Sequence, residues 1–418
     1  INRLSKGQRN MNRRIVKFVV PVVFVVSVII AIMVYISIHN NKEAAISLDY
    51  TDLQGLEYSN NSQSYWNTDG ALDVAAAENG YYYVTMENML VYFDIETKDV
   101  VPVCAKPECL HDTYDCNAYL GQLYVFDSIY YYNGYVYYMP VNNGMAELCR
   151  MDASGSSREI VGQLLPSEAT SAIHLAFNGD YAYAYNFTSH ISSEEEFTEE
   201  LVELSLKDGT RNIVYSVTGK GLAVKNVKSF GDKVFFIVQE SENFMDKNKM
   251  QVRSRGLYSY SHDNGVNVVS ENNINDYYIL PDEQKLYYYV TGEGLYVSDI
   301  SSETSQNIYA STKEVDMCSV SSDGRYIYLS NAKYAFYVYG KEQWNKLRYI
   351  VLDKDGNVVN DIKCDYALEL YFGDERFLFC RGMGQDQLMY IDKKDIENAS
   401  EWNEIFNGGI DLINWSKK

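Results

Sequence analysis

The feature that most constrains this chain is a turn-and-strand unit that recurs seven times after residue 70. Each copy has a turn rich in Asn, Asp or Gly, followed by a strand rich in Tyr, Phe, Ile or Val. The copies are NGYYYV from Asn79, NGYVYYM from Asn133, NGDYAYAY from Asn178, FGDKVFFIV from Phe230, PDEQKLYYYV from Pro281, SDGRYIYL from Ser322 and FGDERFLFC from Phe372. Their successive spacings run from 41 to 54 residues. A period near fifty is typical of one four-stranded propeller blade per repeat.

The rest of each repeat continues as strands. LVYFDIETKDVVPV from Leu90 and RYIVLDKDGNVVNDI from Arg348 predict a third strand, a polar hairpin turn and a fourth strand. The shorter apolar runs LDVAAAE from Leu72 and CSVSS from Cys318 precede the repeated turns and predict the innermost strands. Helical periodicity is nearly absent after residue 70. We therefore predict an all-β fold, a single β-propeller over residues 70–414 with seven four-stranded blades; six or eight blades are the alternatives.

An uncharged apolar run occupies residues 18–38 and is long enough to cross a hydrocarbon core as one helix. Six basic residues lie in the tail 1–17 before it, which predicts a cytoplasmic N-terminus. Residues 39–69 are polar and predict an extracytoplasmic stalk or irregular lead-in, and 415–418 form a short C-terminal tail. We predict a signal-anchor helix and a single-pass protein of the cell membrane with its large domain outside the cytoplasm; a cleaved signal peptide is the competing interpretation.

The charge of the large domain limits its partners. The formal net charge is −21, and removing the six positive charges of the tail leaves −27 for the remainder. A negative field of this size repels the phosphate backbone, so we predict no nucleic-acid binding. Cations or cationic partners fit better, although solubility alone also explains the charge.

Two segments carry a family resemblance. SDGRYIYL is similar to the signature of TolB-like propeller repeats, and ENGYYYV with the later CAKPECLHDTYDCNAYL resembles a family of uncharacterised bacterial membrane-anchored β-propellers. That family contains a domain like the low-density-lipoprotein-receptor-related propeller. The resemblance covers most of the chain after residue 70 and implies a propeller beyond a membrane or lipid anchor. It implies no activity.

The densest group of reactive side chains is Cys104, Cys109, His111 and Cys116, with the spacing C-x4-C-x-H-x4-C. Three thiolates and one imidazole within thirteen residues could complete a tetrahedral structural zinc site. Outside the cytoplasm, two of the three cysteines could instead form a disulfide, which leaves the third thiol free and His111 exposed. Both interpretations stay open at this stage, and the sequence predicts no other cofactor. We predict that the four remaining cysteines are buried apolar residues.

The sequence contains no G-x-S-x-G, H-E-x-x-H or Walker motif. We therefore predict a membrane-tethered binding or scaffold module that contacts an extracytoplasmic protein, peptide or glycan through one face or the central channel. The alternative is an extracytoplasmic glycan-active hydrolase or lyase, whose carboxylates converge at the channel from different blades; linear motifs do not reveal such a site. A propeller fold accommodates both classes.

Overall fold

A computed structural model of the chain describes residues 46–57, 74–85, 88–111, 115–120, 129–167, 173–186, 195–242, 251–312, 315, 317–331, 347–364, 367–382 and 388–404. The predicted basic tail 1–17, the predicted membrane helix 18–38 and the C-terminal tail 415–418 lie outside these residues. Among the residues described, no helix has the length and apolar character that crossing a membrane requires. Within these described ranges, two short 3-10 helices, η2 (Pro281–Glu283) and η5 (Lys393–Asp395), occur among strands, turns and irregular segments.

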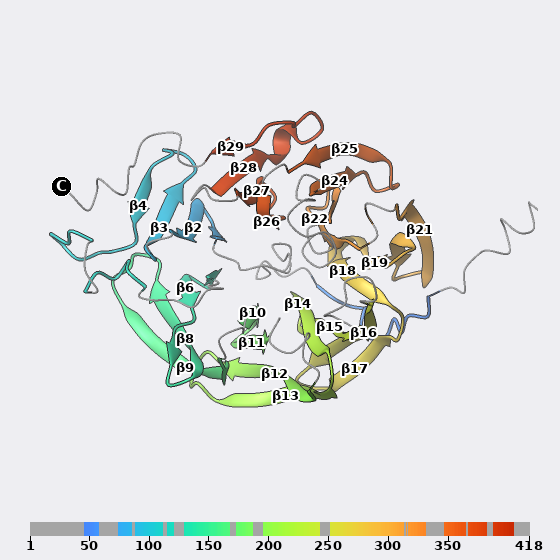
Figure 1. Cartoon of the computed structure of the whole chain (residues 1–418), viewed down its shortest axis with the longest axis horizontal. Coiled ribbons are helices and arrows are strands. Elements are labelled where there is room, and N and C mark those ends of the chain that lie inside the picture. The colour runs from blue at the N-terminus through green and yellow to red at the C-terminus, as the bar shows by residue number, and fades with distance from the viewer. Residues whose placement is uncertain are drawn as a thin grey trace, which may run out of the picture. The chain divides into compact units, whose positions relative to one another are not determined.

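The part of the chain from Leu48 to Lys418 forms one compact unit. Within it, seven antiparallel sheets follow one another around a ring, and each sheet is made of consecutive strands (Figure 1). The predicted seven-bladed propeller is therefore confirmed.

The first four blades cover residues 74–270. Blade 1 contains β1 (Val74–Ala77), β2 (Gly80–Val84), β3 (Leu90–Asp94) and β4 (Val100–Pro102); blade 2 contains β5 (Tyr130–Tyr132), β6 (Tyr135–Tyr138), β7 (Val141–Asn142), β8 (Met145–Asp152) and β9 (Arg158–Pro166); blade 3 contains β10 (Ile173–Asn178), β11 (Tyr181–Asn186), β12 (Phe197–Ser205) and β13 (Arg211–Gly219); blade 4 contains β14 (Leu222–Phe230), β15 (Lys233–Glu242), β16 (Gln251–Ser261) and β17 (Gly265–Ser270). Blade 2 differs from the prediction because the short β7 adds a fifth strand that pairs with β8.

The last three blades cover residues 274–404 and each has four strands. Blade 5 contains β18 (Ile274–Leu280), β19 (Lys285–Val290), β20 (Gly294–Asp299) and β21 (Thr304–Ala310); blade 6 contains β22 (Ser319–Ser322), β23 (Ile327–Ser330), β24 (Arg348–Leu352) and β25 (Val358–Lys363); blade 7 contains β26 (Ala367–Tyr371), β27 (Phe377–Gly382), β28 (Leu388–Asp392) and β29 (Asn403–Glu404).

The repeated motif of the sequence forms the turn between the first and second strands of every blade. Gly134 and Gly324 adopt φ values of 82° and 80° in two of these turns, a conformation that glycine reaches without steric cost. The Tyr-rich and Phe-rich run that follows each turn forms the second strand of its blade, which is β2 in blade 1 and β27 in blade 7. Both predicted innermost strands are also confirmed, as β1 and β22.

The core lies between neighbouring blades. One cluster of buried side chains joins blades 7, 1, 2 and 3, and others join blades 6 and 7, blades 1 and 2, and blades 3 and 4. Tyrosine supplies ten of the eleven largest fully buried side chains in the described residues. Its ring packs between sheets while its hydroxyl donates to a neighbouring blade, as from Tyr277 to the Asn226 carbonyl (2.7 Å) and from Tyr349 to the Tyr371 carbonyl (2.9 Å).

Side chains join the last blade to the first. In the part of the chain that the structure describes, each of these two blades is made of its own consecutive strands. The Tyr81 hydroxyl of blade 1 donates to Asp374 of blade 7 (2.7 Å). The Arg376 guanidinium lies 4.9 Å from the Tyr81 ring and donates to the carbonyls of Ala77 and Glu78. Among the described residues, blades 7 and 1 are therefore joined by their shared hydrophobic cluster, one buried tyrosine and one arginine–aspartate pair.

The described part of the predicted stalk packs against the blades. Leu53 and Leu56 are buried, and Asp52 forms an ion pair with Lys233 of blade 4 (2.8 Å) and accepts a hydrogen bond from Ser259 (2.6 Å). Burial opposes ionisation of Asp52, but Lys233 and Ser259 outweigh it and lower the pKa of the carboxyl. Residues 48–57 are thus an irregular lead-in attached to the propeller, and the outer limits of the predicted stalk stay a prediction.

Candidate functional site

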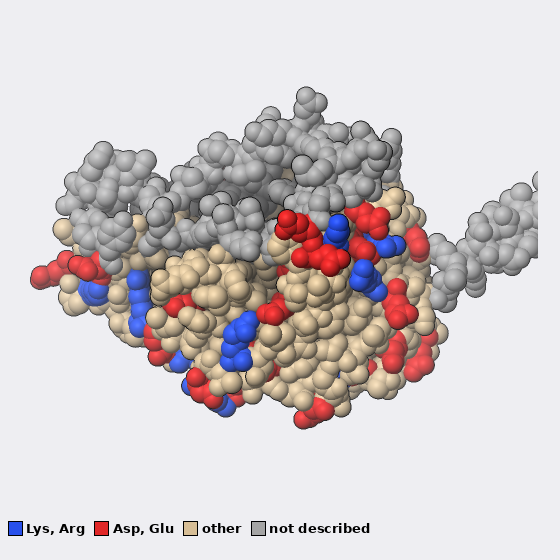
Figure 2. Space-filling model, turned by 60° about the horizontal axis from the view of Figure 1, so that its bottom comes forward, with Lys and Arg blue, Asp and Glu red and all other residues tan. Residues whose placement is uncertain are grey.

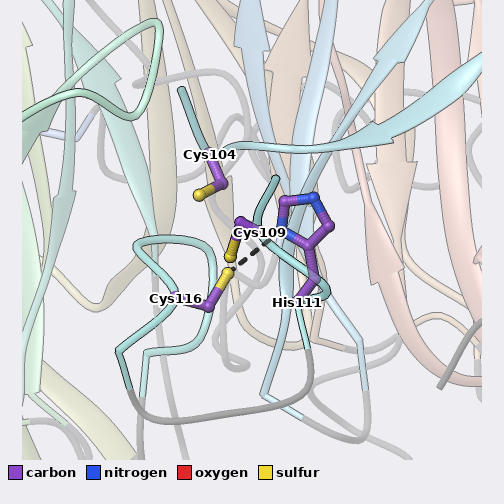
Figure 3. Close-up of side chains that lie close together, drawn as sticks. All are labelled: Cys104, Cys109, His111 and Cys116. Atoms are coloured by element: carbon purple, nitrogen blue, oxygen red, sulfur yellow. Dashed lines mark hydrogen bonds between the residues drawn. The ribbon is translucent and has the colours of Figure 1, made fainter. Parts of the chain in front are cut away.

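The cysteine and histidine cluster lies in the loop that leaves blade 1 after β4. Figure 3 shows the side chains of Cys104, Cys109, His111 and Cys116 pointing toward one another. One ligand atom from each residue lies within 4.8 Å of the ligand atoms of the other three. His111 Nδ1 is 3.2 Å from Cys116 Sγ. The structure therefore brings together all four residues that the sequence singled out.

Backbone N–H groups surround two of the sulfurs. Burial alone would raise the pKa of Cys104, but the backbone N–H groups of Lys106 and Asn117 stabilise its thiolate and lower the pKa. Cys116 is fully buried, and burial raises the pKa of its thiol to about 12 despite the backbone N–H groups of Ala118 and Tyr119. A divalent cation at the centre of the cluster would favour the thiolate at both positions.

The loop is fastened to blade 2. The guanidinium of Arg158, at the start of β9, donates to the backbone carbonyls of Cys116 (3.1 Å) and Tyr119 (2.5 Å), and also to that of Asn117. The Asn117 amide donates to the carbonyl of Gly155 (2.7 Å). A Cβ at Gly155 would lie 2.3 Å from the Val103 carbonyl oxygen, so glycine permits this close approach. The cluster therefore sits at the joint between blades 1 and 2.

All seven cysteines lie in the described residues, and the structure pairs none of them in a disulfide. Cys149, Cys318, Cys364 and Cys380 are buried, as predicted. Burial raises the pKa of the Cys149 thiol to about 11, which is the behaviour of an inert core thiol.

A second candidate site was not foreseen from the sequence. A cavity of about 280 Å³ lies where the turns between the first and second strands of blades 4, 5, 6 and 7 meet. Its apolar wall includes Phe230, Tyr278, Ile279, Leu280 and Pro281. We call this cavity the turn-face pocket. Four blades contribute to it, so its lining comes from positions that are about fifty residues apart in sequence.

Five carboxylates line the turn-face pocket, and they differ in their partners. Asp374 is buried and accepts from Tyr81 and Arg376, Asp323 accepts from the Tyr328 hydroxyl (2.6 Å), and Glu283 forms an ion pair with Lys354. The other two, Asp282 and Glu375, are exposed. Neither has a hydrogen-bond or ion-pair partner among the described residues.

The only cation lining the pocket, among the residues described, is Lys393 of η5. Its side chain is buried, donates to the Asp374 carbonyl and lies 4.3 Å from the ring centre of Tyr328. Burial lowers the pKa of Lys393 to about 8, and the nearby carboxylates of Asp323, Asp374 and Glu375 only partly offset this effect.

Charges of both signs are mixed elsewhere. On the face drawn in Figure 2, carboxylates and cationic side chains gather together at the upper right, and wide uncharged areas lie between the remaining charged groups. Among the acidic residues at the start of β12, Glu199 is buried. Glu203, further along β12, is also buried, and its Oε2 lies 3.0 Å from Nε2 of His262. The DKDGN segment from Asp353 forms the predicted hairpin turn between β24 and β25.

A buried polar network joins the inner strands of blades 4, 5 and 6. Lys228 of β14 and Asp276 of β18 form an ion pair of 2.8 Å, and each side chain is 1% exposed. Asp276 also accepts from the Asn226 amide (3.1 Å) and from the backbone N–H of Val320 in β22 (2.7 Å). Lys228 donates to the Tyr277 carbonyl (2.6 Å). No sequence motif reveals this network, because the hydrogen bonds between its blades join residues 44 to 50 positions apart.

No protein-family model matches this sequence, and no curated protein matches it. Solved structures resemble it at low identity. The tricorn protease is 12% identical with a TM-score of 0.45, over 84% of this chain and 35% of that chain. The propeller domain of the Trilobed protease from Pyrococcus furiosus is 11% identical with a TM-score of 0.44, over 84% of this chain and 97% of that one. TolB from Acinetobacter baumannii is 12% identical with a TM-score of 0.36, over 67% of this chain and 61% of that one.

This chain thus spans about a third of the tricorn protease and less than two thirds of TolB. These likenesses concern the fold, and the assignment of seven blades rests on the strand pairing.

Proposed function

We propose that this chain is a membrane-tethered, extracytoplasmic binding module whose turn-face pocket takes a Lys or Arg side chain of a protein or peptide partner. The observation that carries the proposal is the composition of the pocket: an apolar wall with two exposed carboxylates, Asp282 and Glu375, that lack described partners. The tether is supported by the uncharged apolar run of residues 18–38 and the basic tail before it.

The shape of the ligand follows from the two parts of the pocket. Lys and Arg have an apolar stem that packs on hydrophobic surface and a cationic head that stays near water or a carboxylate. In the pocket, the stem would pack on the wall formed by Phe230 and Tyr278, and the head would meet Asp282 or Glu375. The net charge of −21 attracts such a partner over longer distances.

A catalytic role has weaker support. A glycoside hydrolase needs two carboxylates flanking the scissile bond, one as acid and one as base or nucleophile. In the turn-face pocket, Asp374 and Asp323 are engaged by donors of the fold, and Glu283 is paired with Lys354. The remaining pair, Asp282 and Glu375, is exposed to solvent, whereas the general acid of such an enzyme lies in an apolar pocket.

The test measures binding of fluorescein-labelled octapeptides to the full chain in detergent micelles by anisotropy at low ionic strength. The peptides carry one Lys, Arg or Leu between glycines, and labelled chito-oligosaccharide is included as a glycan probe. We expect the Lys and Arg peptides to bind more tightly than the Leu peptide. The double variant Asp282→Asn/Glu375→Gln should weaken their binding about three- to tenfold, since each solvent-exposed ion pair contributes under about 1 kcal/mol.

The matched control removes two exposed carboxylates from the hairpin between β3 and β4 of blade 1, as Glu96→Gln/Asp99→Asn. This control should change the affinity for the Lys and Arg peptides by no more than about twofold. A change of that size is within the range of a single solvent-exposed ion pair. Equal weakening by both double variants would show that only the overall charge matters. Saturable binding of the chito-oligosaccharide, with no preference among peptides, would replace the proposal with a glycan-binding role.

A further inference from the structure

We propose that Cys104, Cys109, His111 and Cys116 bind one Zn²⁺ ion as a structural site that fastens the loop between blades 1 and 2. The convergence of four ligand atoms within 4.8 Å is the first observation behind it. In a tetrahedral zinc site, Zn–S bonds of about 2.3 Å and Zn–N bonds of about 2.0 Å keep all ligand atoms within about 4 Å of one another. The side chains of the structure are therefore arranged as such a site needs, with small adjustments.

A disulfide explains less of the geometry. It would bond two sulfurs at about 2.05 Å and give the third cysteine and the histidine no reason to converge. In the structure, however, the imidazole of His111 turns its Nδ1 to within 3.2 Å of Cys116 Sγ. The third thiol lies in the same group. Three sulfurs and one imidazole nitrogen are a donor set that suits Zn²⁺, a borderline-soft cation.

The site is structural rather than catalytic because four protein ligands leave no open position for water or substrate. The backbone N–H groups that point at Cys104 and Cys116 supply the outer-shell hydrogen bonds typical of thiolate–metal centres. Arg158 then fixes the backbone from Cys116 to Tyr119 to blade 2.

The first part of the loop, residues 105–111, contributes nothing to the core. None of the side chains from residue 105 to residue 111 is buried, and Leu110 is 67% exposed. Glu108 and His111 adopt φ values of 61° and 57°, a region that non-glycine residues rarely occupy. A segment without a core of its own is commonly stabilised by a metal or a disulfide.

The experiment uses the full chain, purified in detergent micelles without chelators or added metal. We expect about one zinc atom per chain by mass spectrometry of the metal content. After unfolding in the presence of a chelator, all seven cysteines should react as free thiols. Replacing zinc with Co²⁺ should give the ligand-field and thiolate charge-transfer absorption of a tetrahedral site. Oxidation of two loop thiols without any bound metal would overturn the proposal, and so would seven free thiols without metal.

Variants assign the site. Cys109→Ser should lose the bound zinc. His111→Asn should lose it as well; because Asn tolerates positive φ, this variant separates ligation from backbone strain. His111→Cys should keep the zinc in a four-cysteine shell. The matched control Cys149→Ala removes a buried cysteine of blade 2 and should leave the zinc content unchanged.

Zinc content that survives both Cys109→Ser and His111→Asn would place the metal elsewhere and overturn the assignment. The metal content of the unaltered chain is decisive even where a variant fails to fold. None of these readouts depends on the turn-face pocket, so the zinc site and the proposed binding function succeed or fail separately.

Discussion

The inner edge of blades 4 to 6 and the loop between blades 1 and 2 both contain irregular backbone, but they are stabilised in opposite ways. In β14, the register shifts between Lys225 and Lys228, and Asn226 has a φ of 51°. In the loop, Glu108 and His111 have positive φ values. The bulge of β14 lies in a buried strand, whereas the loop runs over the surface.

The difference follows from what surrounds each segment. At the bulge, Lys228 and Asp276 supply opposite charges, and neighbouring carbonyl and N–H groups complete their hydrogen bonds. In the described part of the loop, none of the side chains from residue 105 to residue 111 is buried, and four ligand groups converge instead. Irregular backbone is thus tolerated inside the protein where polar groups satisfy one another, and the proposed zinc would supply a cross-link where the loop has no core.

The largest expected effect comes from breaking the buried pair. Lys228→Met leaves the Asp276 carboxylate buried without its cation, so the free energy of unfolding should fall by about 3–5 kcal/mol in urea titrations. Lys285→Met is the control, since Lys285 and Asp299 form an ion pair of 2.6 Å that is about one third exposed. That change should cost less than about 1 kcal/mol. Equal losses from the two variants would show that the network of blades 4 to 6 is no stronger than a surface pair.

The second effect concerns the loop. Removing the proposed zinc with a chelator should lower the free energy of unfolding by at most about 3 kcal/mol, the value expected for a cross-link that closes a loop of this length. Hydrogen exchange should accelerate in residues 103–120 and stay unchanged in blades 4 to 6. Faster exchange throughout the propeller would contradict the view that this cross-link acts locally.

Arg158→Met tests the other attachment of the loop. The guanidinium donates to three carbonyls of residues 116–119, so the free energy of unfolding should fall by about 1–2 kcal/mol. Zinc content should stay at one per chain, because Arg158 is not a ligand. Loss of the metal in this variant would mean that the ligands do not converge without the guanidinium.

Lys393 is a second buried cation, but it differs from Lys228 because its hydrogen-bond acceptor is a carbonyl rather than a carboxylate. Its pKa is lowered to about 8 by burial, whereas in the unfolded chain the pKa is near 10.5. Between these pH values the unfolded chain binds more protons, so stability rises with pH. Relative to Lys393→Met, the free energy of unfolding of the unaltered chain should increase by about 1 kcal/mol from pH 7 to pH 9.

That difference is measured in urea at each pH, and comparing the two proteins cancels the titration of the other groups. A flat difference across this range would show that the fold does not lower the pKa of Lys393, because a lysine whose pKa is at or above 10.5 in both states stays protonated up to about pH 9.

The blades could be predicted from the sequence because each repeated turn and its following strand are local. The Asn133–Gly134 turn and the strand after it need no information from elsewhere in the chain. The convergence of Cys104 and Cys116 could likewise be predicted from the sequence, because only twelve positions separate them.

Contacts between distant residues could not be predicted in this way. Tyr81 and Asp374 meet across 293 positions, and Asp52 reaches Ser259 across 207. No sequence pattern marks either pair, because a Tyr in a strand or an Asp near a turn is common whether or not it makes such a long-range contact. The contact between Glu203 and His262 is also absent from any sequence pattern, since His262 lies in another blade. The turn-face pocket was missed because four blades build it.

The closure through Tyr81, Asp374 and Arg376 has an evolutionary consequence. Each blade is made of consecutive strands, so the unit that repeats in the sequence is also the unit of hydrogen-bonded pairing. Duplication or deletion of one such unit of about fifty residues would add or remove a complete sheet without separating any paired strands. Only the contacts at the new seam would have to be rebuilt. This architecture can therefore grow or shrink by recombination in whole blades.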